Sequence, residues 1–408
     1  MSKTETPSIR FRGFEDAWEQ RKLGEMGQTY TGLSGKTKDD FGHGQARFVT
    51  YMNVFSNPIS NPEMTEPIEI DPKQNEVEVG DVFFTTSSET PEEVGMSSIL
   101  LEKRGKTYLN SFCFGFRPSE KIDSYYLAYM LRSESTRAKI ILLAQGISRY
   151  NISKNKVMEI AVSLPSLDEQ KMIGQYFSQL DNLITLHQRK FEKLTNVKKS
   201  MLEKMFPRNG SCYPEIRFKG FTDPWEQRKF GEITSKYEDP VPTPHDGYYR
   251  LGIRSHAKGT FHSYVAKGQE LETAQMHRVA AGNFIVNITF GWEHAVAITD
   301  KNDAGKLVSH RFPQFSFAEG MVPEFFRYVI VDEKFRHHLW LASPGGAGRN
   351  RVLKLDEMLN YLMRFPSRDE QIKIAEFFRQ LDNLITLHKR ELEKLQGTKK
   401  ALLEKMFV

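Results

Sequence analysis

Apolar residues recur at alternating intervals of four and three along two stretches of the chain, one near its middle and one near its end. This spacing places apolar side chains along one side of an α-helix, and its persistence is typical of helices that pair in coiled coils. Each row is apolar except for one histidine and one lysine. The first row is Leu180, Ile184, His187, Phe191, Leu194, Lys198, Met201 and Met205, and the second is Leu381, Ile385, His388, Leu392, Leu395, Lys399, Leu402 and Met406.

The two stretches are copies of one another. Residues 179–206 read QLDNLITLHQRKFEKLTNVKKSMLEKMF and residues 380–407 read QLDNLITLHKRELEKLQGTKKALLEKMF, with 20 of 28 positions identical. A leading segment is also repeated, as IRFRGFEDAWEQRKLGE at 9–25 and IRFKGFTDPWEQRKFGE at 216–232. A repeat of this length indicates two related structural units, each made of a leading segment, a variable block and a long helix.

The variable blocks, 26–164 and 233–365, differ in sequence but share a skeleton. Gly80–Thr86 and Gly282–Ile288 each have the pattern of a turn that leads into a buried strand. Aromatic and aliphatic residues at helical spacing follow later in both blocks. We therefore predict an α+β fold, in which two mixed globular domains are joined by two long helices that form an intramolecular antiparallel coiled coil. The predicted boundaries are 1–165 for the first domain, 166–207 for its helix, 208–366 for the second domain and 367–408 for its helix.

The ends and the layers of the helices suggest how they pair. Ser166–Glu169 and Ser367–Glu370 each have the S-x-x-E pattern of a capping box, which marks a helix start. With the rows antiparallel, every apolar layer meets an apolar layer, whereas a parallel pairing would stack two lysines in one layer. An antiparallel helix pair would relate the two domains by an approximate twofold axis. The residues expected to fix its register are His187 opposite Lys399 and Lys198 opposite His388.

Composition narrows the function only slightly. The net charge of +5 is compatible with a polyanionic partner and equally with a lysine-rich solvated surface. Two distant cysteines, Cys113 and Cys212, indicate neither a disulfide framework nor a thiolate metal site. The N-terminus has no secretory signal, and no run of 18 apolar residues occurs, so we expect a cytoplasmic protein without membrane association.

Motifs of catalysis are not apparent in the chain. No GK[ST] or HExxH sequence occurs. The nearest string to an adenine methyltransferase loop is Asp223-Pro224-Trp225, which lacks a second proline and aligns with Asp16-Ala17-Trp18 in the repeat. We therefore expect no catalytic residue, no metal site and no cofactor in this chain, although a nuclease-like group of carboxylates near a lysine stays open.

The repeated segments together resemble the specificity subunit of type I restriction–modification enzymes. The motifs that carry the resemblance are the paired LPSLDEQ and FPSRDEQ helix starts, the QLDNLITLH…LEKMF helices and the IRF[RK]GF…WEQRK segments. The resemblance implies two target recognition domains that each read one half of a split double-stranded DNA sequence, with the helices as a spacer. It also implies two modification subunits that use S-adenosylmethionine, and restriction subunits that use ATP and Mg²⁺.

Candidate DNA contacts follow from side-chain chemistry, because Arg and Lys neutralise phosphates while Arg, Asn, Ser and Thr also read base edges. For each cation, a solvated surface group is the alternative. The alternative for the whole chain is a coiled-coil interaction scaffold with two ligand-binding lobes and no DNA target. The candidates are Lys36, Lys38, Thr85, Thr86, Ser87, Ser88, Ser148, Arg149 and Tyr150 in the first block, and Arg254, Ser255, His256, Lys258, Asn287, Arg349 and Arg351 in the second.

Overall fold

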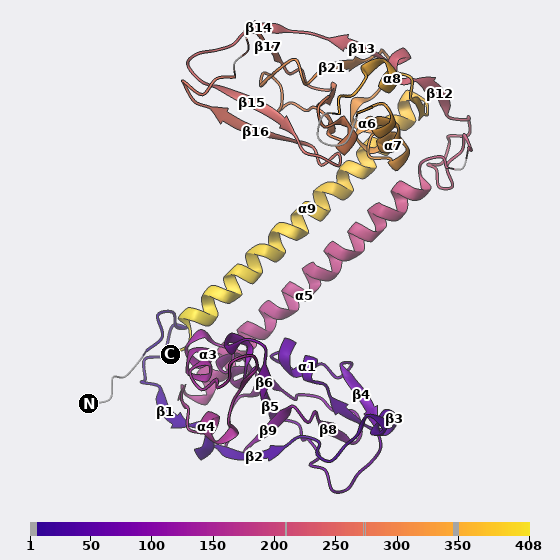
Figure 1. The fold of residues 1–408 in the computed structure, drawn as a ribbon. Helices are drawn as coiled ribbons and strands as arrows, with labels where there is room; N and C mark the ends of the chain where they lie inside the picture. Colours follow the sequence, from indigo (N-terminus) through magenta and orange to yellow (C-terminus); the bar gives the residue numbers. More distant parts are fainter. Residues whose placement is uncertain (1–5, 209, 272, 274, 346–350) are drawn as a thin grey trace. The chain divides into compact units, whose positions relative to one another are not determined.

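The structure is a computed structural model, and it describes residues 6–208, 210–271, 273, 275–345 and 351–408. The chain forms two compact units: unit 1 comprises Met1–Arg189 with His388–Val408, and unit 2 comprises Lys190–Leu387. Each unit contains one mixed domain and part of both long helices, α5 (Leu167–Lys204) and α9 (Arg368–Lys405) (Figure 1). The predicted α+β fold with two long paired helices is confirmed.

Unit 1 is built on a four-stranded antiparallel sheet in the order β2-β9-β5-β7, beside a three-stranded sheet in the order β4-β3-β8. Two shorter pairs, β1-β11 and β6-β10, complete its strands. The strands are β1 (Glu19–Lys22), β2 (Gly27–Thr31), β3 (Phe41–Val49), β4 (Thr65–Ile68), β5 (Val82–Thr85), β6 (Ser87–Ser88), β7 (Ser97–Ile99), β8 (Thr107–Leu109), β9 (Cys113–Pro118), β10 (Tyr150–Asn151) and β11 (Ala161–Leu164). The short helices are α1 (Tyr51–Ser56), α2 (Ser124–Met130), α3 (Glu134–Ile141) and α4 (Lys154–Met158).

Unit 2 repeats the four-stranded sheet, in the order β13-β21-β18-β19, but its second sheet has five strands in the order β14-β17-β20-β15-β16. The strands are β12 (Glu226–Lys229), β13 (Thr234–Tyr237), β14 (Pro240–Pro242), β15 (Tyr248–Ile253), β16 (Thr260–Val265), β17 (Gln275–Arg278), β18 (Phe284–Val286), β19 (Val296–Ile298), β20 (Leu307–Val308), β21 (Gln314–Phe317) and β22 (Leu362–Phe365). The short helices are α6 (Pro323–Val329), α7 (Glu333–Leu341) and α8 (Leu355–Leu359).

The shared skeleton expected from the sequence is present in both units. Gly80 and Gly282 both have positive φ, at 98° and 82°, and each precedes a fully buried strand, β5 or β18. Glycine suits these turns because it lacks the Cβ that makes positive φ costly. The strands lie inside their four-stranded sheets, and α2 and α6 follow at corresponding places.

The leading segment ties each domain to the start of its long helix. Strand β1 pairs with β11, which directly precedes α5, and β12 pairs with β22, which directly precedes α9. Arg10 Nε and Nη2 donate to the carboxylate of Glu169 at 2.7 and 2.8 Å, and Arg217 contacts Glu370 in the same bidentate way at 2.8 and 2.7 Å. These hydrogen bonds raise the pKa of both arginines, so both guanidinium groups stay charged.

The capping box is therefore only half formed at α5. The amide of Glu169 donates to Ser166 Oγ at 3.4 Å, as expected. The carboxylate of Glu169 is almost fully buried and accepts from Arg10 instead of returning to Ser166. The S-x-x-E pattern thus marks the helix start correctly, while the glutamate binds a residue distant in sequence, which local spacing does not reveal.

Both units enclose ends of the long helices in their cores. In unit 1, Phe407 near the end of α9 packs against Phe177 of α5 and Tyr126 of α2, with ring centroids 5.6 Å apart in both pairs. In unit 2, Phe206 after α5 packs against Phe378 of α9 and Trp225. Residues late in one helix thus lie beside residues early in the other, which makes the pairing antiparallel within each unit.

The register of that pairing differs from the prediction. Lys399 Nζ contacts Asp181 Oδ1 at 2.5 Å, and Lys198 Nζ contacts Asp382 Oδ1 at 2.5 Å. His187 and His388 contact each other through their Nδ1 atoms, 3.1 Å apart. The predicted pairing of each histidine with a lysine was wrong, because long lysine side chains reach aspartates outside the apolar rows, where an ion pair stabilises them.

Each lysine–aspartate pair also binds a tyrosine, which is buried in unit 1 and half-buried in unit 2. Tyr129 Oη donates to Asp181 at 2.8 Å, and its ring lies 5.3 Å from Lys399 Nζ. In unit 2, Tyr328 and Asp382 with Lys198 repeat this cluster. Burial, together with the neighbouring aspartate, raises the pKa of both phenols, which therefore remain donors at neutral pH. The clusters connect α2 and α6 to both long helices.

No helix in the described ranges combines the length and the apolar character that crossing a membrane requires.

We expect Arg10→Met to lower the free energy of unfolding of unit 1 by about 3 kcal/mol, because Glu169 would stay buried without its cation. Arg10→Met combined with Glu169→Met should lose much less, since both charges are then absent. Urea unfolding followed by circular dichroism measures both. Arg12→Met, an exposed neighbour in the same segment, is the control. Equal losses in the single and double variants would contradict the account.

The observed register predicts a charge-exchange result. Asp181→Lys or Lys399→Asp alone places like charges together and should cost about 1 to 2 kcal/mol of unfolding free energy. The double variant should recover part of the loss, but not the bond from Tyr129. A double-mutant cycle in urea measures the coupling. Purely additive losses would show that the two side chains do not meet.

Candidate nucleic-acid interface

A tight loop on unit 1 gathers several of the predicted residues. Gln145 and Asn151 exchange two backbone hydrogen bonds of 2.9 Å and so close the base of the loop. Strand β10, which starts at Tyr150, pairs with β6, so Tyr150 lies opposite Ser88 and Asn151 opposite Ser87. The structure therefore brings together the predicted groups 85–88 and 148–150, which are far apart in sequence.

Within this group, exposure separates structural from accessible residues. Thr85, Ser87 and Ser88 are buried. Thr85 Oγ1 accepts from the amide of Met96, and Ser88 donates to Glu93. Thr86 is half-buried and donates to the carbonyl of Phe112 at 2.9 Å. Three of these hydroxyl residues therefore support the strand end from inside, and the surface consists of Ser148, Arg149 and part of Thr86 and Tyr150.

Arg149 is exposed, and its guanidinium lies 5.8 Å from the centre of the Phe112 ring. Phe112 itself is exposed, so the arginine is held against an aromatic face at the surface. Such stacking positions the cation without neutralising it, because the ring offers only its quadrupole. Arg149 is thus suited to contact a phosphate or a base edge.

Two other cations of unit 1, Lys36 and Arg137, already have acidic or carbonyl partners. Lys36 Nζ contacts Asp71 at 2.9 Å, and this hydrogen bond raises the pKa of Lys36. Lys38 is exposed beside Asp39. Arg137 donates to backbone carbonyls of residues 92, 94 and 95, and burial lowers its pKa to about 10, so it remains a cation with a structural role.

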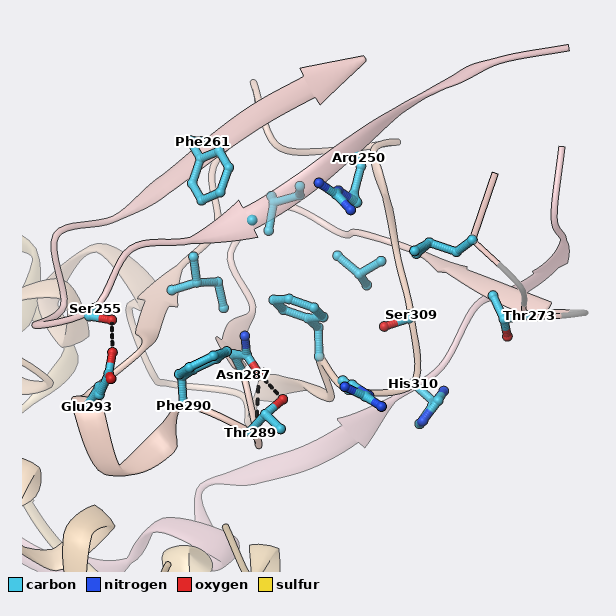
Figure 2. A pocket seen from close by; sticks show the side chains of 17 residues that line it. Arg250, Ser255, Phe261, Thr273, Asn287, Thr289, Phe290, Glu293, Ser309 and His310 are labelled. Carbon is cyan, nitrogen blue, oxygen red and sulfur yellow. Dashed lines mark hydrogen bonds between the residues drawn. The ribbon is translucent and has the colours of Figure 1, made fainter. Parts of the chain in front are cut away.

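Unit 2 contains a cavity of about 640 Å³. It is lined by residues of β15, β16 and β20 and by the loops that follow β15, β18 and β20. Figure 2 shows the Ser255–Glu293 pair at one end of this cavity and Arg250, Ser309 and His310 at the other. Asn287 and Thr289 lie between them, together with Phe290. Cations, hydroxyls, an amide and aromatic rings thus line one cavity, which suits a ligand with both polar edges and apolar faces.

The structure places the predicted residues of unit 2 in several roles. Ser255 Oγ donates to Glu293 at 2.6 Å, and Asn287 Oδ1 accepts from Thr289 N at 3.0 Å and Oγ1 at 2.8 Å. Arg254 donates to the carbonyl of Thr260 and stacks over Phe261. Among the predicted residues of unit 2 that the structure describes, Ser255 and Asn287 line the cavity.

The remaining predicted residues lie elsewhere. His256 has a positive φ of 61° in an exposed turn, with Lys258 exposed nearby. The guanidinium carbon of Arg351 lies 5.0 Å from the centre of the Trp340 ring. Arg349, the counterpart of Arg149, lies outside the described residues, so its loop is not compared with that of Arg149.

Sequence reasoning missed most of the cavity. The residues it did not select include Arg250, Phe290 and the run Ser309-His310-Arg311. That run of polar and basic residues directly after the buried strand β20 was the available signal. Arg250 gave no such signal, since it alternates within a strand pattern, where a solvated face is the ordinary interpretation.

Groups that could bind a metal ion do not assemble here. Among the described residues, no three His, Cys, Asp or Glu side chains converge on one point. The cavity of unit 2 instead combines hydrogen-bond donors with aromatic rings, and the Arg149 loop of unit 1 places a guanidinium beside the Phe112 ring.

Comparison with known proteins agrees with this chemistry. The family model described as "Type I restriction modification DNA specificity domain" matches residues 15–196. The specificity subunit of the type I restriction enzyme MjaVIII from Methanocaldococcus jannaschii is 25% identical over 323 residues, covering 75% of this chain and 74% of that protein. A second protein of that organism, which carries the name type I restriction enzyme MjaX specificity subunit, is 23% identical over 405 residues. The match covers 95% of this chain and 92% of that protein.

The fold has a counterpart among solved structures. The S subunit of a type I restriction-modification system from M. genitalium superposes with a TM-score of 0.60 at 12% identity, covering 99% of both chains. The matched domain and the relatives that align along most of the chain agree with the repeated segments. Residues 15–196 of this chain thus match the type I restriction modification DNA specificity domain, and most of its length is similar to type I restriction enzyme specificity subunits.

Proposed function

We propose that the chain is a DNA-recognition subunit without catalytic activity of its own, and that each unit reads one half of a bipartite double-stranded DNA target. The observation that carries the proposal is the duplicated scaffold with two different surfaces. Both units repeat the four-stranded sheet and the Tyr–Asp–Lys cluster, but unit 1 presents the Arg149 loop and unit 2 presents the cavity around Asn287. One scaffold with two surfaces fits a target with two unlike halves.

The chemistry of both surfaces supports base reading. Arginine and histidine donate to acceptors on guanine or phosphate, while the amide and hydroxyl groups of Asn287 and Thr289 can face base edges. Phe290 and Phe112 are exposed and can contact thymine methyl groups or sugars. Glu293 provides an acceptor, held by Ser255, for an exocyclic amine.

The long helices are proposed to set the spacing of the half-sites and to dock two modification subunits. Each unit exposes one pair of leucines three residues apart on a long helix: Leu183 and Leu186 on α5 in unit 1, and Leu384 and Leu387 on α9 in unit 2. These side chains are 43% to 51% exposed, although they occur in the most strongly repeated part of the sequence. An apolar pair repeated in this way fits a partner that binds twice.

Catalysis is proposed to reside in the partners. The modification subunits would bind S-adenosylmethionine and methylate DNA, and the restriction subunits would use ATP and Mg²⁺. The residues of this chain would only bind, orient and space the DNA for them.

We predict that Arg250→Ala alters only one half of the methylated motif. Loss of a base or phosphate contact of this kind costs about 1 to 3 kcal/mol of binding free energy. Methylation at cognate sites should therefore fall about tenfold or more, or the base specificity at one position of that half-site should relax. Methylome sequencing of a host that expresses the chain with its modification subunit measures this. Arg278→Ala, an exposed arginine outside the cavity, should leave the motif unchanged. A wild-type motif that is not split into two half-sites would refute the proposal. So would an Arg250→Ala variant that changes the recognised bases equally in both half-sites.

Assembly should depend on the exposed leucines. Leu183→Asp with Leu186→Asp should weaken binding of one modification subunit by at least tenfold, because two apolar contacts become charged. The same change at Leu384 and Leu387 should affect the other subunit. Native mass spectrometry of co-expressed complexes counts the bound subunits, and Lys193→Asp on α5 controls for charge. Full occupancy in both double variants would exclude these faces as docking sites.

A further inference from the structure

Ile147 is the most exposed large apolar side chain in the described part of the protein, with 95% of its surface accessible. It lies in the loop between Gln145 and Asn151, next to Ser148 and Arg149. An exposed isoleucine side chain is unfavourable in water, because transferring its apolar surface to an apolar environment lowers the free energy. A single such side chain at the tip of a polar loop therefore calls for a ligand that buries it.

The loop holds Ile147 in a preformed position. Its base is closed by the two hydrogen bonds between Gln145 and Asn151, and the amide of Ile152 donates to the carbonyl of Thr86 at 3.0 Å. Gly146 has φ of 147°, and a Cβ at this position would lie only 2.0 Å from the carbonyl oxygen of Arg149. The chain therefore turns back on itself within a few residues, and only glycine fits the turn.

A cation accompanies the apolar tip. Arg149 is exposed and stacks on Phe112, so apolar and cationic groups occur within one narrow projection. Stable protein interfaces need broad apolar cores, whereas a single branched side chain beside an arginine matches a step between two base pairs. Apolar side chains inserted at such steps partly unstack the bases, and a neighbouring arginine favours the adjoining phosphates or a narrowed minor groove.

We propose that the loop 145–151 inserts Ile147 between two adjacent base pairs of the half-site read by unit 1 and thereby kinks the DNA, with Arg149 contacting the backbone beside the step. This inference rests on the proposed DNA-recognition function. It adds a contribution of DNA deformability to the specificity, since pyrimidine–purine steps unstack at lower cost than others. The half-site of unit 1 should then contain such a step.

The test uses the full chain in complex with its modification subunit and a duplex containing the cognate motif. A 2-aminopurine base, placed in turn at each step of the half-site, reports unstacking by its fluorescence, and energy transfer between the duplex ends reports bending. The wild-type complex should give a bend and one enhanced 2-aminopurine position. Ile147→Ser should lose both signals and bind about tenfold more weakly.

Three variants identify the cause. Ile147→Leu keeps an apolar wedge and should restore the signals. Val79→Ser removes an exposed apolar side chain between Glu78 and Gly80, away from the loop in sequence, and should leave bend and affinity unchanged. Salt titration distinguishes the two loop residues: Ile147→Ser should keep the slope of log affinity against log salt, whereas Arg149→Ala should reduce that slope by about one.

Several results would overturn the proposal. Unchanged fluorescence and bend in Ile147→Ser would show that the side chain does not enter the DNA. Loss of the modification subunit from the Ile147→Ser complex would make the loop a protein contact. If the wild-type complex bound no specific sequence, the proposed function itself would fail, which is distinct from specific binding without unstacking.

Discussion

The antiparallel pairing of α5 with α9 is the constraint on which the rest of the structure depends. Neither domain completes its core from one helix alone. Met406 and Phe407, directly after α9, are buried among residues of unit 1, and Met205, directly after α5, is buried among residues of unit 2. Separating the helices would expose both cores, so helix pairing and domain folding stabilise each other.

Polar interactions then select the register within that apolar pairing. The two clusters formed by a tyrosine, an aspartate and a lysine are directional, and each needs residues from both long helices and from a short domain helix. Apolar layers alone tolerate a shift by one heptad, whereas these clusters do not. Each domain is thereby fixed to the helices at one defined position, while the surfaces beyond the sheets remain free to differ. The three-stranded and five-stranded second sheets are such a difference.

The sequence predicted the architecture well, because repeats and hydrophobic periodicity report directly on repeated packing. The buried strands after Gly80 and Gly282 and both long helices were located from these signals. The register was not, because the layer argument treated His187 and Lys399 as partners and did not include Asp181, which lies outside the apolar row. Likewise, Glu169 was expected to cap its own helix, but Arg10, distant in sequence, binds it. Such partners depend on tertiary structure, which local spacing does not encode.

The candidate site was predictable only in part for the same reason. Thr85, Ser87 and Ser88 have side chains that can read bases, but they are buried, and composition cannot distinguish a buried hydroxyl from an accessible one. Arg149 and Asn287 were selected for their side-chain chemistry, and the structure leaves Arg149 exposed and places Asn287 at the cavity. Arg250 and His310 line the cavity only through the folding of distant strands.

The central claim is the proposed one, that the paired helices set the distance between two DNA half-sites. It is tested most directly by inserting one heptad after Arg189 and another after Arg390, the equivalent points of the two copies, and sequencing the methylome of a host that expresses this variant with its modification subunit. Each insertion adds about 10 Å of helix. The account predicts unchanged bases in both half-sites and a spacer longer by about three base pairs. Altered half-site bases, or an unchanged spacer in an active complex, would contradict it.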